Sequence, residues 1–389
     1  MPQISINKLF ILFYLQTIAG TFPKSANVLN AFSVRHSCLS TKNPYLCLES
    51  NVYSLKHVTI KDIARYLSIS VSTVSRALVD DKNIRKETKE KVLETAKQLG
   101  YKPNPVATNL KYGHTNTVGV IVPEMVTPFA SRVVSGIQEV LYANRIKVII
   151  AESAEDPVKE KENLKFMERF MVDGIIISLC SYKKNQEEYL RLQQAEMPMV
   201  FYDRIPYGLD VSQVIVDDYQ KSFFLIERLI RNGCRQIAHI QGPDDVYNSF
   251  ERARGYKDAL QKYNIAFDER MVIQTGLTFE DGKRVAEELH ERNLPFDAVF
   301  AFTDTLAIGA MNRLRELGRK IPEEVAIASF SGTELSTIVY PKLTTVEPPL
   351  FQMGKTAAEL ILEKIKNPLS PNRSVVLNAE IKMRASTES

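Results

Sequence analysis

The stretch that most constrains this chain runs from Val58 to Arg76 and reads VTIKDIARYLSISVSTVSR. Its apolar residues recur three and four positions apart in two short runs, which predicts two amphipathic helices. Thr59 precedes the first helix and Ser70 the second, and both residue types are favoured N-caps. Residues 68–70 form the short turn between them. Such a pair is typical of a helix-turn-helix, although an ordinary helical hairpin shows the same pattern.

A helix-turn-helix places its second helix in the major groove of DNA, with residues near the helix N-terminus against the base edges. In this sequence those residues are Val71, Ser72 and Arg76. Arg76 can donate two hydrogen bonds to a guanine, and Val71 can contact a thymine methyl group. The pattern therefore assigns base reading to these three side chains.

A third amphipathic helix is predicted within KETKEKVLETAKQLGYKPN. Val92, Leu93, Ala96 and Leu99 are expected on its apolar side, and Gly100 is the expected C-cap. Three short helices suffice for the core of a small headpiece. This third helix favours the helix-turn-helix over the plain hairpin.

The motifs VTIKDIA, TVSR and LGYKPN resemble the signatures of the lactose/galactose-repressor family of bacterial transcription regulators. The resemblance covers about residues 57–387. It implies an all-α headpiece joined to a bilobed, periplasmic-binding-protein-like α/β domain. Two residues depart from the family pattern, because Ser68 stands at a usual turn glycine and Arg85 at a usual small N-cap. Both departures suggest a less favourable headpiece that DNA stabilises further.

Length and charge agree with such a division of the 389 residues. Residues 56–112 contain 12 Lys and Arg against 6 Asp and Glu, whereas residues 113–389 contain 34 against 39. The basic end is the expected nucleic-acid end, because phosphate neutralisation supplies most sequence-independent affinity. The expected segments are an N-terminal extension (1–55), the helix-turn-helix headpiece (56–102), a hinge helix or linker (103–116), and an effector-binding and dimerisation domain (117–389).

Residues 1–55 do not fit the family. LFILFYL follows Lys8 and resembles a weak signal-peptide core, but it is far too short to span a membrane unaided. We expect a start site assigned too far upstream, with Val52 or Leu55 as alternative starts, or else a poorly ordered extension. Export would separate the headpiece from DNA, so the expected compartment is the cytoplasm and no membrane partner is expected.

Four cysteines show neither C-x-x-C nor Cys/His metal spacing, so we expect no metal site and no cofactor. A reducing cytoplasm is the simplest setting for them. Cys38 and Cys47 are candidates for a disulfide only if the N-terminus is exported.

Residues 103–116 are too polar to form a stable isolated helix. The resemblance implies a hinge helix that orders on operator DNA and wedges Leu110 into the minor groove, and a plain linker is the alternative. Thr108 replaces a frequent family arginine, which suggests one phosphate contact fewer. The residues expected to contact DNA are Thr59, Ser70, Val71, Ser72, Thr73, Arg76, Tyr101, Asn104 and Leu110.

From Thr117 onward apolar runs alternate with amphipathic segments, as in VGVIVP, KVIIAES, DGIIISL and MPMVFYDR. This alternation predicts parallel sheets covered by helices on both faces, in two doubly wound subdomains. Ligands bind such folds in the crevice beyond the C-terminal ends of the strands. The polar residues expected at these ends are Asp203, Arg204, Asp217, Asp218, Thr303, Asp304 and Ser331, with Arg252 entering a nearby helix.

The pattern of these polar residues does not indicate an enzyme. A catalytic site needs a nucleophile with a partnered base, or a metal-binding spacing. The five histidines, at positions 36, 57, 114, 239 and 290, provide neither. Asp304 precedes an apolar-striped segment, and we expect it to cap that helix rather than contact a ligand.

The resemblance also implies roles at the crevice. Thr127, Pro128 and Phe129 are similar to a family segment whose aromatic ring stacks on a sugar, and Asp203 and Arg252 match residues that hydrogen-bond effectors. Departures at Leu277, Thr303 and Ser331, where an aromatic residue, Asn and Asp are usual, imply an effector different from those of the best-known members. A carbohydrate or carbohydrate phosphate is the leading class. The expected effector-binding residues are Phe129, Asp203, Arg204, Arg252, Leu277, Thr303 and Ser331.

These observations favour a transcriptional repressor whose operator affinity is controlled by a small ligand. A homodimer, or a tetramer built from it, would present two headpieces to palindromic operator DNA. An exported sugar-binding receptor shares the bilobed fold and would explain the apolar N-terminus, but it would have no use for the headpiece. An enzyme on this fold is the third alternative.

Overall fold

The computed structural model describes residues 58–102 and 114–388. By internal contacts the chain divides into two compact units, Met1–Lys102 and Pro103–Ser389, and each is described by itself. The expectations for the N-terminal extension, for Cys38 and Cys47, and for Asn104, Thr108 and Leu110 lie outside the described residues.

The described part of the first unit is a three-helix headpiece built of α2 (Ile60–Leu67), α3 (Val71–Leu78) and α4 (Lys86–Gln98). Ile63, Val74 and Val92 form its centre and are fully buried, so the predicted helix-turn-helix is confirmed. The prediction for Leu93 is wrong, because this side chain is 52% exposed. The buried face of α4 instead continues through Thr95.

The helix ends of the headpiece follow its sequence closely. Asp62 accepts hydrogen bonds from the backbone N and the hydroxyl of Thr59, at 2.9 and 2.7 Å, and this closes the first turn of α2. The Ser70 hydroxyl caps α3 by accepting from the Thr73 backbone N at 3.1 Å. Gly100, one residue beyond the cap of α4, adopts a φ of 68° and lets the chain turn away.

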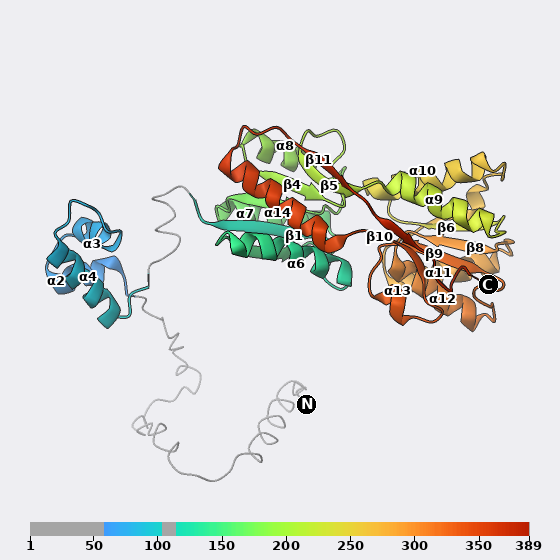
Figure 1. The fold of residues 1–389 in the computed structure, drawn as a ribbon, viewed down its shortest axis with the longest axis horizontal. Coiled ribbons are helices and arrows are strands. Elements are labelled where there is room, and N and C mark those ends of the chain that lie inside the picture. The colour runs from blue at the N-terminus through green and yellow to red at the C-terminus, as the bar shows by residue number, and fades with distance from the viewer. Residues whose placement is uncertain (1–57, 103–113, 389) are drawn as a thin grey trace, which may run out of the picture. The chain divides into compact units, whose positions relative to one another are not determined.

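The second unit contains two lobes, each built on a six-stranded sheet (Figure 1). In the first lobe the strand order is β11-β5-β4-β3-β1-β2, and the pairings are parallel. The elements of the first lobe are β1 (Thr117–Val122), α6 (Pro128–Ala143), β2 (Lys147–Glu152), α7 (Pro157–Arg169), β3 (Gly174–Ile177), α8 (Gln186–Gln194), β4 (Met199–Tyr202), β5 (Ser212–Val216), α14 (Leu350–Lys366) and β11 (Ser374–Leu377).

In the second lobe the order is β12-β10-β9-β8-β6-β7, and β12 alone runs antiparallel to its neighbour among the described strands. The elements of this lobe are α9 (Asp218–Arg231), β6 (Ile237–Gln241), α10 (Tyr247–Lys262), the 3-10 helix η1 (Glu269–Met271), β7 (Val272–Gln274), α11 (Phe279–Glu291), β8 (Ala298–Ala301), α12 (Asp304–Glu316), β9 (Ala326–Phe330), α13 (Leu335–Ile338), β10 (Thr344–Glu347) and β12 (Glu380–Lys382).

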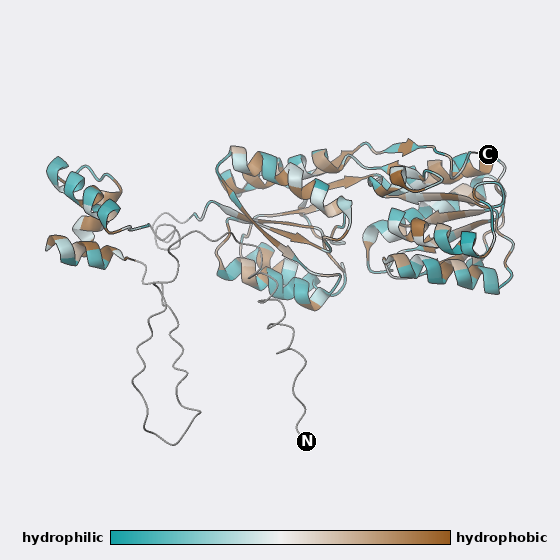
Figure 2. Cartoon of the chain, turned by 90° about the horizontal axis from the view of Figure 1, so that it is seen from below, coloured by the Kyte–Doolittle hydropathy of each residue, from teal (hydrophilic) through white to brown (hydrophobic). Residues whose placement is uncertain are grey.

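Both faces of each sheet are covered by helices, as the apolar strands require. Figure 2 shows hydrophobic strands between helices whose outer faces are hydrophilic. Helices α6 and α14 pack on one face of the first sheet and α7 and α8 on the other. In the second lobe α9 and α10 cover one face, and α11 and α12 cover the other. The predicted α/β architecture with two doubly wound subdomains is confirmed.

The lobes are not consecutive in the sequence. Within residues 114–388 the chain passes between them three times, after β5, after β10, and between β11 and β12 (Figure 1). The first lobe therefore depends on α14 and β11 from near the end of the chain. Among the described residues, no helix is long and apolar enough to cross a membrane.

Candidate DNA-binding surface and ligand-binding cleft

The outward face of α3 carries the residues expected to read bases. Val71 is 39% exposed despite being apolar, and Ser72 and Arg76 are also exposed. Arg76 forms no ion pair with a described residue, so its guanidinium is available for an external acceptor. The hydroxyl of Ser70 is engaged in capping and lies 2.7 Å from that of Ser72. Ser70 therefore caps the start of α3, and its hydroxyl is not free to contact DNA independently of Ser72.

The other headpiece candidates differ in exposure. Thr59 lies exposed at the start of α2, whereas Thr73 is half-buried under the start of α3. Tyr101 packs against the headpiece core, and burial raises the pKa of its hydroxyl. Its backbone N donates to the Ala96 carbonyl at 2.8 Å, so this residue also ends α4.

In the second unit, all of the expected effector-binding residues line one cavity between the lobes, with a volume of about 340 Å³. Strand ends explain this convergence. Asp203 and Arg204 follow β4, Thr303 follows β8, and Ser331 follows β9. The carboxyl ends of parallel strands face the same crevice in a doubly wound fold. The cavity residues predicted from sequence are Phe129, Asp203, Arg204, Arg252, Leu277, Thr303 and Ser331.

Arg252 lies deep in the cavity wall and is only 3% exposed. Its Nε donates to Asp218 at 2.8 Å and its Nη1 donates to the Phe302 carbonyl at 2.7 Å. The guanidinium carbon lies 4.4 Å from the centre of the Phe302 ring and 3.7 Å from that of Phe330. The planar group is therefore fixed by stacking as well as hydrogen bonding. Burial raises the pKa of Asp218, and the charge of Arg252 opposes that rise.

A second arginine at the cleft is paired within the first lobe. Arg204 donates from Nη1 and Nη2 to the two oxygens of Glu155, at 2.7 and 2.9 Å. The neighbouring Asp203 adopts a left-handed φ of 57°, which turns it away from the line of β4. Burial raises the pKa of Asp203, while Arg204 and Arg252 act in the opposite direction. Asn248 donates to its Oδ1 at 3.3 Å.

The expectation that Asp304 caps a helix is wrong. Thr303 is the N-cap of α12, and its hydroxyl accepts from the Leu306 backbone N at 3.3 Å. Asp304 is buried and accepts from three hydroxyls, those of Ser329, Thr345 and Thr333, at 2.7 to 2.9 Å. It joins α12 to β9 and β10, so its carboxylate fixes one wall of the cavity.

Sequence reasoning missed several cavity residues. Ser178 follows β3 and Tyr202 ends β4, so the strand-end rule could have selected both. Asn248 lies one helical turn before Arg252 on α10, at a spacing that places both on one face. Phe279 and Phe302 add aromatic surface, and nothing in the sequence distinguished them from core residues.

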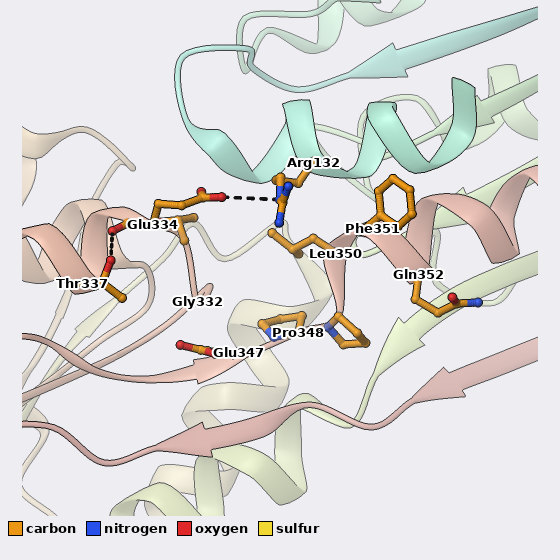
Figure 3. Close-up of a pocket in the computed structure, with 11 residues that line it drawn as sticks. Arg132, Gly332, Glu334, Thr337, Glu347, Pro348, Leu350, Phe351 and Gln352 are labelled. Carbon is orange, nitrogen blue, oxygen red and sulfur yellow. Dashed lines mark hydrogen bonds and ion pairs between the residues drawn. The ribbon is translucent and has the colours of Figure 1, made fainter. Parts of the chain in front are cut away.

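A second cavity of about 470 Å³ lies where the chain passes from β10 to α14 (Figure 3). Arg132 of α6 and Glu334, just before α13, face each other across it and form an ion pair of 3.4 Å. This contact connects the first lobe to the second. Within residues 58–102 and 114–388, no cluster of His, Cys, Asp and Glu could hold a metal ion.

Comparisons with known proteins agree with this architecture. The family described as bacterial regulatory proteins, lacI family, matches residues 59–104, and a periplasmic binding protein-like domain matches residues 226–387. Over 333 residues the chain is 31% identical to Catabolite control protein A of Priestia megaterium, covering 85% of this chain and 100% of that protein. It is 31% identical over 330 residues to the HTH-type transcriptional repressor PurR of Vibrio atlanticus, covering 85% and 98%.

A solved structure, that of the transcriptional regulator CelR in complex with cellobiose, superposes with a TM-score of 0.66 at 28% identity. It covers 85% of this chain and 100% of the other. A helix-turn-helix headpiece followed by a two-lobed binding domain is therefore common to the chain and its relatives. On this identity and coverage, the chain belongs to the lacI family of bacterial regulatory proteins.

Proposed function

We propose that this DNA-binding transcriptional regulator is a homodimeric repressor. Its affinity for operator DNA changes when a small carbohydrate binds in the cleft between its lobes. The observation that carries this proposal is the convergence of seven sequence-selected residues on one 340 Å³ cavity. Residues from both lobes line it, so a ligand there contacts both at once. A ligand that binds one arrangement of the lobes better than another shifts the equilibrium between them.

The carbohydrate assignment rests on the chemistry of the cavity wall. Phe129, Phe279 and Phe302 offer apolar and aromatic surface, and Asp203 and Arg252 offer hydrogen-bonding groups beside it. This combination suits a ring with apolar faces and polar edges. The complex of CelR with cellobiose supports the same class. Because the ligand acts on a DNA-binding protein, we place its action in the cytoplasm, and we propose binding without chemical transformation.

The DNA side of the proposal makes a prediction for Arg76. Replacing it with alanine should cost about 1–3 kcal/mol on the specific site and relax the base preference at one position per half-site. The operator is first selected from random duplexes with the full chain, and affinities are then measured on that operator and on its single-base variants. An equal loss on every duplex would instead identify Arg76 as a phosphate contact.

The ligand side is tested with Arg252→Lys, which keeps a cation beside Asp218 but removes the planar fork. We expect the change in operator affinity on adding the effector to be lost, while operator affinity without effector stays near its original value if effector is an inducer. If effector is a corepressor, the same variant should bind DNA weakly at all effector concentrations. Arg254→Lys, on the same helix and half exposed, is the matched control. An unaltered response in Arg252→Lys would remove this residue from the site.

A further inference from the structure

We infer that the effector of this protein is an uncharged saccharide, and that the cleft discriminates against its phosphorylated form. This inference rests on the proposed function, because it assumes that the effector occupies the cavity between the lobes. It goes beyond that function by choosing between a sugar and a sugar phosphate. Three features of the cavity carry it.

The first feature is that the cations of the cleft are already neutralised. Among the described residues that line the cavity, the cationic side chains are Arg204 and Arg252. Arg204 is held by both oxygens of Glu155, and Arg252 by Asp218 and a backbone carbonyl. The carboxylates that line the cavity outnumber these two arginines. A dianionic phosphate would therefore enter a site that already carries net negative charge. Recognition of phosphate normally uses arginine or lysine side chains that are free to contact it.

The second feature concerns the helix N-termini that reach the cavity. A helix N-terminus attracts anions through its free N–H groups and its dipole. At α6 the carboxylate of Glu124 accepts from the backbone N of Thr127 at 2.8 Å. At α11 the carboxylate of Asp281 accepts from the backbone N of Thr278 at 3.1 Å. At α12 the first helical residue is the buried Asp304. A carboxylate of the protein therefore lies at the start of each of these helices, and its negative charge opposes the binding of a phosphate there.

The third feature is a set of neutral groups that point to a hydroxyl-bearing ligand. Ser178, Tyr202 and Asn248 line the cavity, and each is at most 2% exposed. The Ser178 Oγ, the Tyr202 hydroxyl and the Asn248 Oδ1 are buried and have no hydrogen-bond partner among the described residues. A buried polar group without a partner costs stability, which a ligand can restore.

The orientation of the Asn248 amide also favours a neutral sugar over a sugar phosphate. Its Nδ2 lies 3.3 Å from Asp203 Oδ1, and a carboxylate oxygen can only accept from it, so Oδ1 is directed elsewhere as an acceptor. A ligand hydroxyl can donate to Asn248 Oδ1 and accept from Tyr202 or Ser178. A fully ionised phosphate can only accept. Hydroxyl groups can therefore satisfy all three side chains, whereas a phosphate group that lies against Asn248 leaves the amide oxygen unpaired.

The inference is tested by calorimetry on the full chain with matched ligand pairs. The probes are glucose and glucose 6-phosphate, fructose and fructose 6-phosphate, ribose and ribose 5-phosphate, together with cellobiose, adenosine and uridine. We expect at least one neutral saccharide to bind, and its phosphorylated partner to bind at least tenfold more weakly. A phosphorylated member that binds as tightly as its neutral partner overturns the inference. So does a panel in which only nucleosides bind, or in which no saccharide binds.

A variant tests independently whether the neutralisation of Arg204 by Glu155 causes the discrimination against phosphate. Glu155→Gln removes the carboxylate that holds Arg204, and this should reduce the preference for the neutral sugar at least fivefold by improving binding of the phosphate. Glu162→Gln, an exposed position on α7, is the matched control and should leave the preference unchanged. An unchanged preference in Glu155→Gln contradicts the inference. If that variant does not fold, the calorimetric comparison of neutral and phosphorylated ligands still tests the inference. Operator binding measured with the same ligands separates the two proposals, since a phosphorylated effector that controls DNA binding leaves the proposed function intact.

Discussion

Ser68 and Arg85 show how single residues set the stability of the headpiece. Ser68 ends α2 with a left-handed φ of 55°, a conformation that costs a non-glycine residue about 1–2 kcal/mol. Arg85 is the N-cap of α4, and its side chain makes no capping hydrogen bond to a described residue. Both positions therefore hold a residue type that the local backbone does not favour. Their cost falls on the part of the protein that meets DNA.

We expect Ser68→Gly to stabilise the headpiece by about 0.5–1 kcal/mol, because the relief of strain exceeds the larger entropy that glycine loses on folding. Arg85→Ser should add about 1 kcal/mol by supplying a capping hydroxyl. Hydrogen exchange of the headpiece amides in the full chain measures both effects. Slower exchange is the expected result, and exchange as fast as in the original protein would show that these positions do not limit headpiece stability.

His239 links a buried side chain to the pH dependence of stability. It lies between the rings of Tyr256 and Phe300, its Nδ1 is 2.9 Å from the Phe300 carbonyl, and burial lowers its pKa to about 4. Because the unfolded chain takes up this proton near pH 6.5, the unfolded state binds more protons than the native state between pH 6.5 and 4. The contribution of His239 is therefore present above pH 6.5 and is lost as the pH falls toward 4.

This contribution amounts to up to about 3 kcal/mol over that interval, from the size of the pKa shift. His239→Gln should flatten the dependence, since the amide can still donate to the Phe300 carbonyl but does not titrate. Denaturant unfolding at several pH values from 4 to 7 gives the comparison, with the exposed His290→Gln as control. A slope in His239→Gln equal to that of the original protein would assign the effect to other groups.

At the scale of elements, close helix contacts determine how tightly each lobe packs. A Cβ added at Gly354 of α14 would lie 2.0 Å from the Val133 carbonyl oxygen of α6, and one added at Gly136 would lie 2.1 Å from the Phe351 carbonyl. The two helices therefore approach more closely than any side chain at these positions allows. Glycine here serves contact between backbones rather than an unusual φ.

We expect Gly354→Ala to destabilise the second unit by about 1–3 kcal/mol, because separating the helices outweighs the better helix propensity of alanine. Gln352→Ala, on the exposed side of the same helix, should change stability by less than about 0.5 kcal/mol. Thermal unfolding of both variants makes the comparison. Equal melting temperatures for Gly354→Ala and Gln352→Ala would show that the pair can relax without cost.

Features within single helices and strands could be predicted from the sequence, whereas contacts between them could not. The period of the apolar runs gave both sheets, and the strand-end rule brought Asp203, Thr303 and Ser331 to one cavity. These patterns are local, so they can be read without knowing the fold. The role of Asp304 could not be predicted, because its partners lie 25 to 41 residues away on other elements. The pairing of Arg252 with Asp218, 34 residues apart, is unpredictable for the same reason.

At the scale of the whole second unit, the ion pair of Arg132 with Glu334 connects the two lobes on the side shown in Figure 3. Both side chains are more than half exposed, so the pair contributes less than about 1 kcal/mol. Because it joins the lobes in the present arrangement, breaking it should disfavour that arrangement.

We expect Arg132→Gln to change effector affinity by no more than about fivefold, with the change diminishing at high salt. Glu334→Gln should have an effect of the same size and direction, and the double variant should add nothing to it. Calorimetric titrations of the three variants at two salt concentrations supply the test. Additive effects of the two changes would mean that the residues act separately.

The three passages of the chain between the lobes have a consequence for synthesis on the ribosome. The first lobe lacks α14 and an edge strand until residues 350–377 have been made, although its other strands are complete by residue 216. A chain that emerges from its N-terminus therefore exposes the apolar surface of the first sheet that α14 later covers while the second lobe is translated. Chaperone demand during translation should peak over this interval, and a nonsense mutation as late as codon 349 should leave the first lobe unfolded.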